Sequence, residues 1–375
     1  MIELLKNIEC YCPDYGGRRD ILIANEKIER IEPAGTKAWE ACPFLDRIMD
    51  CDGLKAFPGL IDQHVHIVGG GGEHGFGSRI SDISPDDVMR AGVTTLVGLL
   101  GFDCCTKDPA DLFAKAKSLQ KAGLTAYIYS GSYSFPVASL TRSVLRDLIL
   151  VDEVIGVGEI AIADHRSSQL TTAELARLAS AVHAGGMIGG KAGVVHIHLG
   201  EGKGGLGLLL DVLDQTDLPM EMFVPTHVNR QPKLFRQAMD YCGKGGNIDL
   251  TAGETHGIGV PDALKMLVDS GMDLSRVTVS SDSNGSIPTG GVGKIQELFD
   301  DIRGCILEEG IRPEIASRFV TENVAKILKL FPRKGTLRAG ADADIAVLDC
   351  GYRLKMLFCK GRQMVEDGRV VHAEE

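Results

Sequence analysis

The stretch Gly59-Leu60-Ile61-Asp62-Gln63-His64-Val65-His66 ends an apolar run with two histidines at positions i and i+2. Side chains two residues apart in a strand point to the same face, so the spacing predicts that His64 and His66 share one face of a rigid strand. Two imidazoles held in this way form half of a site for a borderline metal such as Zn²⁺. A lone histidine there is more often a satisfied core residue, whereas the pair favours a metal site.

Working outward from this strand, apolar runs rich in β-branched residues alternate with helical patterns through the middle of the chain. The eight runs are Gly59–Ile67, Thr94–Leu100, Ala126–Ser130, Val154–Ile162, Val194–Leu199, Met222–Val228, Asn247–Thr251 and Val277–Ser281. Helical patterns lie between several of them, at Pro109–Ala122, Thr172–Ala184, Pro232–Tyr241 and Val260–Ser270. This alternation predicts an α/β fold of the (β/α)₈ TIM-barrel type. A doubly wound open sheet is the alternative for the same pattern.

Capping residues mark the ends of these helices. Asp108 precedes Pro109 as an N-cap, and Thr171 with Glu174 three residues later has the pattern of a capping box. Glycine adopts the left-handed conformation that ends many helices. We therefore expect helices to stop at Gly123, Gly185 and Gly271.

The two ends of the chain differ from the middle and resemble each other. Short strand patterns occupy both, at Ile2–Ile8, Asp20–Ala24, Lys27–Ile31, Ala343–Leu348, Leu354–Cys359, Arg362–Val365 and Arg369–His372. We expect residues 1–56 and 334–375 to form one small β domain from both termini, and residues 57–333 to form the barrel.

Composition excludes several classes of protein. The 375 residues carry a formal net charge of −11, which argues against nucleic-acid binding. The N-terminus lacks the pattern of a signal peptide, and no apolar run approaches the ~18 residues that predict a membrane span. The 10 cysteines are scattered and form no CxxC pair, which is typical of reduced thiols in a cytoplasmic protein.

Metal-binding and acidic residues recur at the ends of the predicted strands, where barrel enzymes place their active sites. Five of the 10 histidines lie there: His64, His66, His196, His198 and His227. The run Val154–Ile162 carries Glu159, and Asp282 stands at the end of the run Val277–Ser281. We expect these residues to hold two metal ions that share a bridging hydroxide, with His196 one layer deeper in a structural role.

The expected chemistry follows from these residue types. A bound dication lowers the pKa of water from 15.7 to about 7 and polarises a carbonyl. Asp282 can accept a proton from the hydroxide and deliver it to a leaving nitrogen. Taken alone, Asp282 could instead cap the turn in Ser281-Asp282-Ser283-Asn284.

At this point the sequence resembles a known group of enzymes, the amidohydrolase superfamily. The motifs that carry the resemblance span most of the chain: Pro58–His66, Ser280–Asp282, Thr321–Ala325 and Lys334–Asp344. Further motifs resemble one member family, the isoaspartyl (β-aspartyl) dipeptidases: Gly69–Glu73, Val97–Gly101, Ile155–Val157, Asp164–Ser167, Pro225–Arg230 and Asn284–Ser286.

The resemblance implies a role for each matching residue. One metal would be held by His64 and His66, the other by His198 and His227, with Asp282 as ligand and proton shuttle. Substrate groups would be bound as follows: the α-amino group by Glu73, the leaving residue's carboxylate by Arg166 and Arg230, the aspartyl α-carboxylate by Ser286 and the Gly71 backbone, and the scissile carbonyl by Tyr133. The metals implied are two divalent ions, Zn²⁺ above all, and we expect a homo-oligomer.

Two positions depart from the family pattern. The family bridges its metals with a carboxylated lysine, and the matching position here is Glu159. Glutamate supplies the same bridging carboxylate on a shorter stem, which an extra glycine, Gly158, would accommodate. Phe102 stands where the family has a small hydroxyl residue near the substrate's α-carboxylate, so its bulk bears on substrate choice.

Three hypotheses remain open from the sequence. The first is a dinuclear metallo-dipeptidase for β-aspartyl or related small zwitterionic dipeptides. The second is a hydrolase of cyclic amides, like dihydroorotase or hydantoinase, or of N-acyl amino acids, which needs the metals but not Glu73 with two arginines. The third is a barrel that has lost catalysis and serves as a binding protein, which missing metal ligands would favour.

Overall fold

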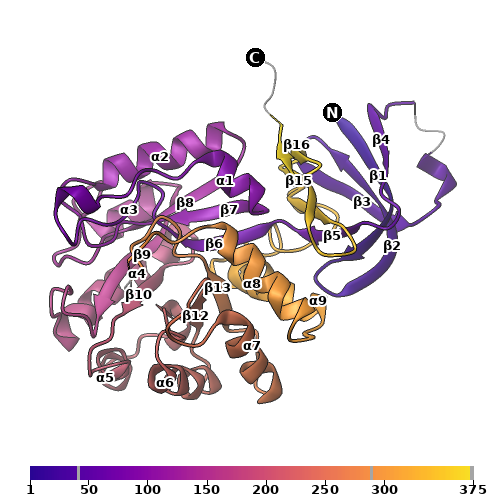
Figure 1. The fold of residues 1–375 in the computed structure, drawn as a ribbon. Coiled ribbons are helices and arrows are strands. Elements are labelled where there is room, and N and C mark those ends of the chain that lie inside the picture. Colours follow the sequence, from indigo (N-terminus) through magenta and orange to yellow (C-terminus); the bar gives the residue numbers. More distant parts are fainter. Residues whose placement is uncertain (40–42, 288–289, 372–375) are drawn as a thin grey trace.

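The computed structural model describes residues 1–39, 43–287 and 290–371, and its larger part is a ring of parallel strands surrounded by helices (Figure 1). The strands are β6 (Leu60–Val65), β7 (Val93–Gly98), β8 (Thr125–Ser130), β9 (Val154–Ile162), β10 (Val194–Leu199), β11 (Phe223–Thr226), β12 (Ile248–Thr251) and β13 (Val277–Ser280). They form a six-stranded sheet in the order β11-β10-β9-β8-β7-β6 and a two-stranded sheet, β12-β13. The eight predicted strands are therefore present, with bounds that differ by at most two residues.

Contacts between the two sheets complete the ring. Val65 at the end of β6 forms a parallel bridge with Ser283 just after β13. On the other side, the Val228 amide donates to the Asp249 carbonyl of β12 over 3.5 Å. The predicted α/β barrel class is confirmed.

Helices cover the outside of the ring (Figure 1). They are α1 (Pro85–Arg90), α2 (Pro109–Lys121), α3 (Val144–Leu150), α4 (Thr172–Gly189), α5 (Gly207–Gln215), α6 (Pro232–Gly243), α7 (Val260–Asp269), α8 (Gln296–Leu307), α9 (Pro313–Ala316) and α10 (Glu322–Ile327), with 3₁₀ turns η1 (Lys37–Trp39), η2 (Phe76–Ser78), η3 (Met220–Met222) and η4 (Ser317–Val320). The Asp108 cap and the Thr171–Glu174 capping box are both formed.

One predicted helix end is wrong. Helix α4 continues through Gly185 and ends at Gly189, and Gly190 is the left-handed residue that caps it. Gly185 serves packing instead, because a Cβ there would lie 2.9 Å from the Cβ of Leu148 on α3. A small residue inside a helix reads like a stop signal when the neighbouring helix is not known.

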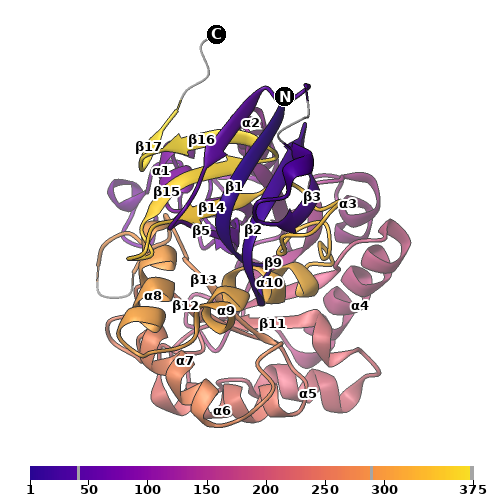
Figure 2. The ribbon, with the colours of Figure 1, turned by 90° about the vertical axis from the view of Figure 1, so that its right-hand side faces the viewer.

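Both termini contribute to a second, nine-stranded sheet, whose indigo and yellow strands lie side by side in Figure 2. Its strands are β1 (Ile2–Tyr11), β2 (Tyr15–Ala24), β3 (Lys27–Pro33), β4 (Arg47–Asp50), β5 (Lys55–Pro58), β14 (Ile345–Leu348), β15 (Leu354–Cys359), β16 (Arg362–Glu366) and β17 (Arg369–Val370). The predicted β domain from both ends is confirmed as a feature of the fold. Its bounds at 1–56 and 334–375 stay a prediction, and His372 lies outside the described residues.

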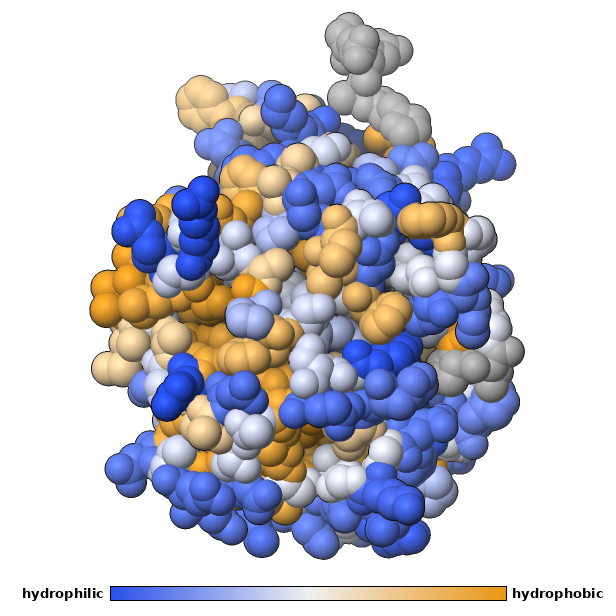
Figure 3. Space-filling view, turned by 90° about the vertical axis from the view of Figure 1, so that its left-hand side faces the viewer, coloured by the Kyte–Doolittle hydropathy of each residue, from blue (hydrophilic) through white to orange (hydrophobic). Residues whose placement is uncertain are grey.

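The terminal sheet sits at the amino end of the barrel strands, because β5 leads directly into β6 through Gly59. The carboxyl ends of the strands therefore open on the other side. Figure 3 shows the face turned away from the terminal sheet, where hydrophobic residues gather toward the left and centre and hydrophilic residues gather toward the bottom and right. None of the helices in the described part of the chain has both the length and the apolar character needed to cross a membrane.

Candidate active site

Four histidines surround one buried carboxylate inside the carboxyl end of the barrel. Glu159 Oε1 lies 2.7 Å from His198 Nδ1, 3.0 Å from His227 Nε2 and 3.5 Å from His64 Nε2. Its other oxygen, Oε2, lies 3.8 Å from His66 Nε2. The Glu159 side chain is 1% exposed. The structure thus brings together all four histidines predicted as ligands around the residue predicted to bridge two metals.

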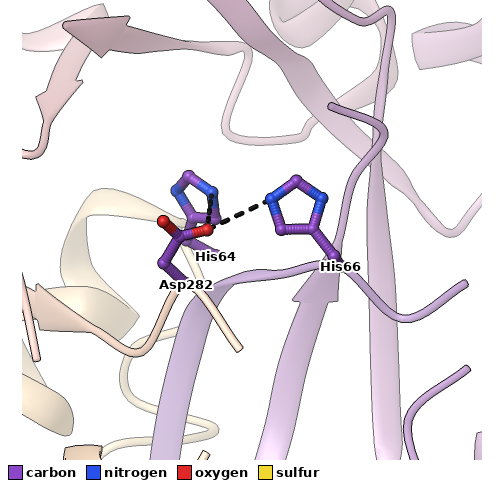
Figure 4. A group of neighbouring side chains, drawn as sticks. All are labelled: His64, His66 and Asp282. Atoms are coloured by element: carbon purple, nitrogen blue, oxygen red, sulfur yellow. Dashed lines mark hydrogen bonds and ion pairs between the residues drawn. The ribbon is translucent and has the colours of Figure 1, made fainter. Parts of the chain in front are cut away.

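Asp282 closes the cluster from the opposite strand. Its Oδ1 lies 3.1 Å from His66 Nε2 and 3.3 Å from His64 Nε2 (Figure 4). Its Oδ2 accepts a hydrogen bond of 2.8 Å from Arg230 Nη2. Asp282 has a positive φ of 51°, so the backbone is turned at this residue just beyond β13. The carboxylate therefore faces the histidines and does not cap the turn that follows it.

The two carboxylates of the cluster strongly favour positive charge on their neighbours. Burial lowers the pKa of His64, but Glu159 and Asp282 raise it by more, to about 10. In return, the histidines hold the pKa of both carboxyl groups well below the usual range, against the opposing effect of burial. The site therefore attracts positive charge strongly.

Buried polar atoms without partners confirm that the donor set fits a metal ion. His64 Nε2, His66 Nδ1 and Glu159 Oε2 are buried and have no hydrogen-bond partner among the described residues. Ligand atoms of His64, His66 and Asp282 lie within 4.8 Å of one another, as do those of His64, Glu159 and His227. Imidazole and carboxylate donors in such groups suit Zn²⁺ and similar divalent ions.

His196 lies deeper in the barrel, as predicted. Its Nε2 is 2.8 Å from His64 Nδ1, so it contacts the far side of a proposed ligand ring. Gly158 allows this packing, because a Cβ at that position would lie 2.9 Å from the Cβ of His196. A glycine before Glu159 thus lets strand β9 approach β10 closely. This brings the Glu159 carboxylate nearer to the histidines, as its side chain, shorter than a carboxylated lysine, requires.

A small cavity of about 20 Å³ lies above the cluster. The residues predicted to bind substrate all line it, together with Tyr133 and Phe102: Gly71, Glu73, Arg166, Arg230 and Ser286. They come from loops that follow different strands, so only the folded barrel brings them together.

The charged groups around the cavity pair with one another. Arg166 Nη1 lies 3.3 Å from Glu73 Oε1, and Ser286 Oγ donates to the same oxygen over 2.6 Å. Arg230 pairs with Asp282, as described above, and its Nε lies 3.6 Å from Glu254. Two anions, Glu73 and Asp282, and two cations, Arg166 and Arg230, therefore face the same small space.

Comparison with known proteins places the chain in a family. The model of the amidohydrolase family matches residues 56–364. The chain belongs to the amidohydrolase family. That family consists of hydrolases, so this chain is a hydrolase.

Solved structures resemble this amidohydrolase in fold over all or nearly all of its length. The crystal structure of β-aspartyl dipeptidase from thermophilic keratin-degrading Fervidobacterium islandicum AW-1 is 40% identical, with a TM-score of 0.94 and complete coverage of both chains. A structure of that enzyme in complex with β-Asp-Leu dipeptide gives 40% identity and a TM-score of 0.93, covering 100% of this chain and 99% of the other. A D-hydantoinase, 16% identical with a TM-score of 0.69 over 99% of this chain and 96% of its own, shares the fold.

Two aromatic residues line the cavity of this amidohydrolase. Tyr133 Oη lies 2.7 Å from His198 Nδ1, and the Arg166 guanidinium lies over its ring, 5.4 Å from the centroid. Burial, and to a lesser degree Glu159, raises the pKa of Tyr133 well above the usual value, so the phenol keeps its proton. Phe102 packs edge-on against Tyr133, with 6.3 Å between ring centroids, and is 39% exposed.

The Gly-rich loop that carries Glu73 is held by a lysine that sequence reasoning missed. Gly71 has φ +80°, and a Cβ there would lie 2.2 Å from the Ser78 carbonyl oxygen, so no other residue fits. The Lys107 ammonium, 6% exposed, donates to the carbonyls of Val68 at 2.6 Å and Ile80 at 2.9 Å. Nothing in the sequence around Lys107 signals these contacts, because they depend on two loops meeting.

Asp164 is the second residue that sequence reasoning left without a role. It follows β9, and its carboxylate contacts both His198 and Arg166. Burial raises the pKa of Asp164, but hydrogen bonds from His198 and Arg166 lower it by more, so the carboxyl group is ionised.

Proposed function

We propose that this amidohydrolase cleaves the β-aspartyl isopeptide bond of small dipeptides, with two divalent metal ions, Zn²⁺ above all, as cofactors. One observation carries the proposal: Glu73, Arg166 and Arg230 face a single cavity above the histidine and carboxylate cluster. A dipeptide with a free α-amino group and free carboxylates has the complementary charges. The relative at 40% identity that is named a β-aspartyl dipeptidase supports the same substrate class.

The metal ligands in this proposal are His64, His66, His198, His227, Glu159 and Asp282, with Glu159 shared between the two ions. When bound, the ions supply Lewis acidity that lowers the pKa of water and polarises the scissile carbonyl. Glu159 needs no CO₂ to provide a bridging carboxylate. Its central place among the four histidines, with contacts of 2.7–3.8 Å, supports this assignment.

Asp282 and Tyr133 are the proposed catalytic residues. The Asp282 carboxylate, held ionised, accepts a proton from the attacking water and passes it to the leaving nitrogen, which must be protonated to depart. The Tyr133 phenol stays protonated, so it can donate a hydrogen bond to the carbonyl oxygen as negative charge develops there.

In this proposal, substrate binding breaks the ion pair between Glu73 and Arg166. Glu73 then binds the substrate ammonium, and Arg166 binds the carboxylate of the leaving residue. Arg230 binds the same carboxylate, while Ser286 and the Gly71 amide bind the aspartyl α-carboxylate. The cavity of about 20 Å³ holds little more than water, so these side chains must move apart when a dipeptide enters.

Phe102 bears on which acidic dipeptides are accepted. Its ring lines the cavity beside Tyr133 and offers no hydrogen bond to a carboxylate. We therefore propose that the Gly71 amide and Ser286 alone supply the donors for the aspartyl α-carboxylate.

A substrate panel with metal analysis tests the proposed function. We expect turnover of β-Asp-Leu and none of hydantoins or N-acetyl amino acids, with about two divalent ions per chain. Variants His64→Ala and His227→Ala should each lose metal selectively. Turnover of hydantoins or N-acetyl amino acids without isoaspartyl dipeptides would reject the dipeptidase and leave the amidohydrolase family intact.

We further propose that the protein acts as a homo-oligomer in the cytoplasm. Light scattering of the purified chain tests the oligomeric state, and a monomer at working concentration would contradict it.

A further inference from the structure

Asp164 is a buried carboxylate in a space between the ends of β9 and β10. It follows Ala163, whose φ of 52° turns the chain at the end of β9. Gly200, just after β10, leaves the room, because a Cβ there would lie 2.5 Å from the Cβ of Asp164. The Asp164 side chain is 5% exposed. Two elements of backbone thus shape the site around this side chain.

The carboxylate binds a proposed metal ligand and a proposed substrate residue at once. Oδ2 lies 3.0 Å from His198 Nε2 and accepts a bond of 2.8 Å from Arg166 Nη2. Oδ1 accepts from Arg166 Nε at 3.1 Å and from the Arg166 amide at 2.7 Å. No other carboxylate among the described residues makes hydrogen bonds to both partners.

We propose that Asp164 is a positioning residue that sets the tautomer of His198 and the direction of the Arg166 guanidinium. The inference rests on the proposed function, because it assigns those two residues to metal and substrate. It goes beyond that function because it assigns to the Asp164 carboxylate the orientation of both His198 and Arg166.

The tautomer follows from hydrogen-bond chemistry. Asp164 Oδ2 lies 3.0 Å from His198 Nε2, so the carboxylate accepts a hydrogen bond when that nitrogen carries hydrogen. Arg166 Nη2 lies 3.4 Å from the same nitrogen but is itself a donor, so the carboxylate takes the bond. The other ring nitrogen, Nδ1, faces Glu159 Oε1 and Tyr133 Oη, each 2.7 Å away. When Nδ1 gives its lone pair to a metal, the one N–H of the neutral ring lies on Nε2, where Asp164 holds it.

The orientation of Arg166 follows from the fork of its guanidinium. Asp164 takes Nε and Nη2, the two donors on one edge. Nη1 remains on the cavity side, where it lies 3.3 Å from Glu73. The guanidinium thus meets a substrate carboxylate through Nη1, with its plane set by Asp164 and by Tyr133 beneath it.

Zinc affinity in the absence of substrate tests the His198 part of the inference. In Asp164→Asn, an amide N–H can face Nε2, which favours the opposite tautomer and blocks Nδ1. We expect Zn²⁺ binding, measured by competition with a chromophoric chelator, to weaken by about 10- to 100-fold at one of the two sites. Wild-type zinc affinity in this variant would overturn the inference.

Two control variants separate positioning from general damage. Asp147 is also fully buried and accepts hydrogen bonds from Ser130 and Thr141, away from the cluster. Asp147→Asn should lose stability but keep its zinc affinity. Arg166→Met should raise KM and keep its zinc affinity, whereas Asp164→Asn should change both. Equal zinc loss in all three variants would reduce Asp164 to a structural role and reject the proposal.

A spectroscopic measurement serves if Asp164→Asn does not fold. In the ¹⁵N-histidine-labelled, zinc-loaded wild-type protein, we expect His198 to carry its proton on Nε2. A proton on Nδ1 would refute the inference. These measurements need no turnover, so they are independent of the proposed substrate. If no dipeptide in the panel is cleaved but His198 has the predicted tautomer, only the proposed substrate is rejected. If the wild type cleaves β-Asp-Leu but Asp164→Asn keeps its zinc affinity, only the role of Asp164 is rejected.

Discussion

Two clusters of buried charge differ in whether their charges balance. At the junction of the terminal sheet with the barrel, Lys334 Nζ lies 2.9 Å from Asp342 and 2.5 Å from Asp344, and the Lys27 ammonium lies 2.5 Å from Asp342. Arg333 Nε also lies 4.0 Å from Asp342, so the two anions are fully matched by cations. At the barrel mouth, Glu159 and Asp282 face one arginine, Arg230, and four histidines.

The difference separates a structural cluster from a functional one. Burying an ion is costly unless a partner of opposite charge compensates for it. The junction cluster supplies its own partners, with Lys334 only 1% exposed. The mouth cluster has one arginine for two carboxylates, and against the lowering effect of burial these carboxylates raise the pKa of His64 to about 10. Three buried nitrogen and oxygen atoms there have no hydrogen-bond partner in the described structure. A divalent cation supplies the missing charge.

The largest effect should come from the unbalanced cluster. Asp282→Asn keeps the shape of the side chain but removes the base that takes the proton. We expect kcat for β-Asp-Leu to fall by ~10²- to 10⁴-fold, measured with saturating Zn²⁺ so that metal loss is not the cause. A variant within a few-fold of the wild type would remove Asp282 from the mechanism.

The balanced cluster should affect stability instead. Lys334→Met leaves two buried carboxylates without their shared partner, so we expect the free energy of unfolding to drop by about 3–5 kcal/mol. Metal content in the folded protein should not change. The surface pair of Lys265 with Asp269 is the control, since Lys265→Met should cost only about 0–1 kcal/mol. Loss of metal in folded Lys334→Met would erase the distinction between the clusters.

A smaller effect should appear at the edge of the mouth. Arg230→Met removes a charge-assisted contact of about 1.5–3 kcal/mol, or roughly 10- to 150-fold in kcat/KM for β-Asp-Leu. Arg230 also pairs with Asp282, so part of the loss comes from that partner. The C-terminal amide of β-Asp-Leu, which lacks the carboxylate of the leaving residue, measures that part by itself. Equal losses on both substrates would exclude Arg230 from carboxylate binding.

No effect at all is expected from CO₂. If Glu159 bridges the metals directly, removal of bicarbonate and CO₂ during metal reconstitution should leave the recovered activity unchanged. A strict requirement would mean that a lysine is carboxylated, and that the bridging role of Glu159 is wrong.

Much of the site could be predicted because it follows strand geometry. Period-two spacing placed His64 and His66 on one face, and the rule that barrel strands end at a common mouth placed His198, His227 and Asp282 beside them. Gly185 was wrongly predicted to end α4, because its role is contact with α3. Local pattern does not reveal which neighbour a glycine admits.

The sequence by itself determined the barrel class, the terminal β domain and the donors at the strand ends, because hydrophobic periodicity and strand direction are local properties of the chain. Only the tertiary structure decided which charges meet. Lys107 binds carbonyls up to 39 residues away, Asp164 after β9 contacts His198 on the neighbouring β10, and Glu73 pairs with Arg166 over 93 residues. These contacts depend on how loops from different strands close over one mouth, and a buried charge is stable only beside the partner that the closed fold provides.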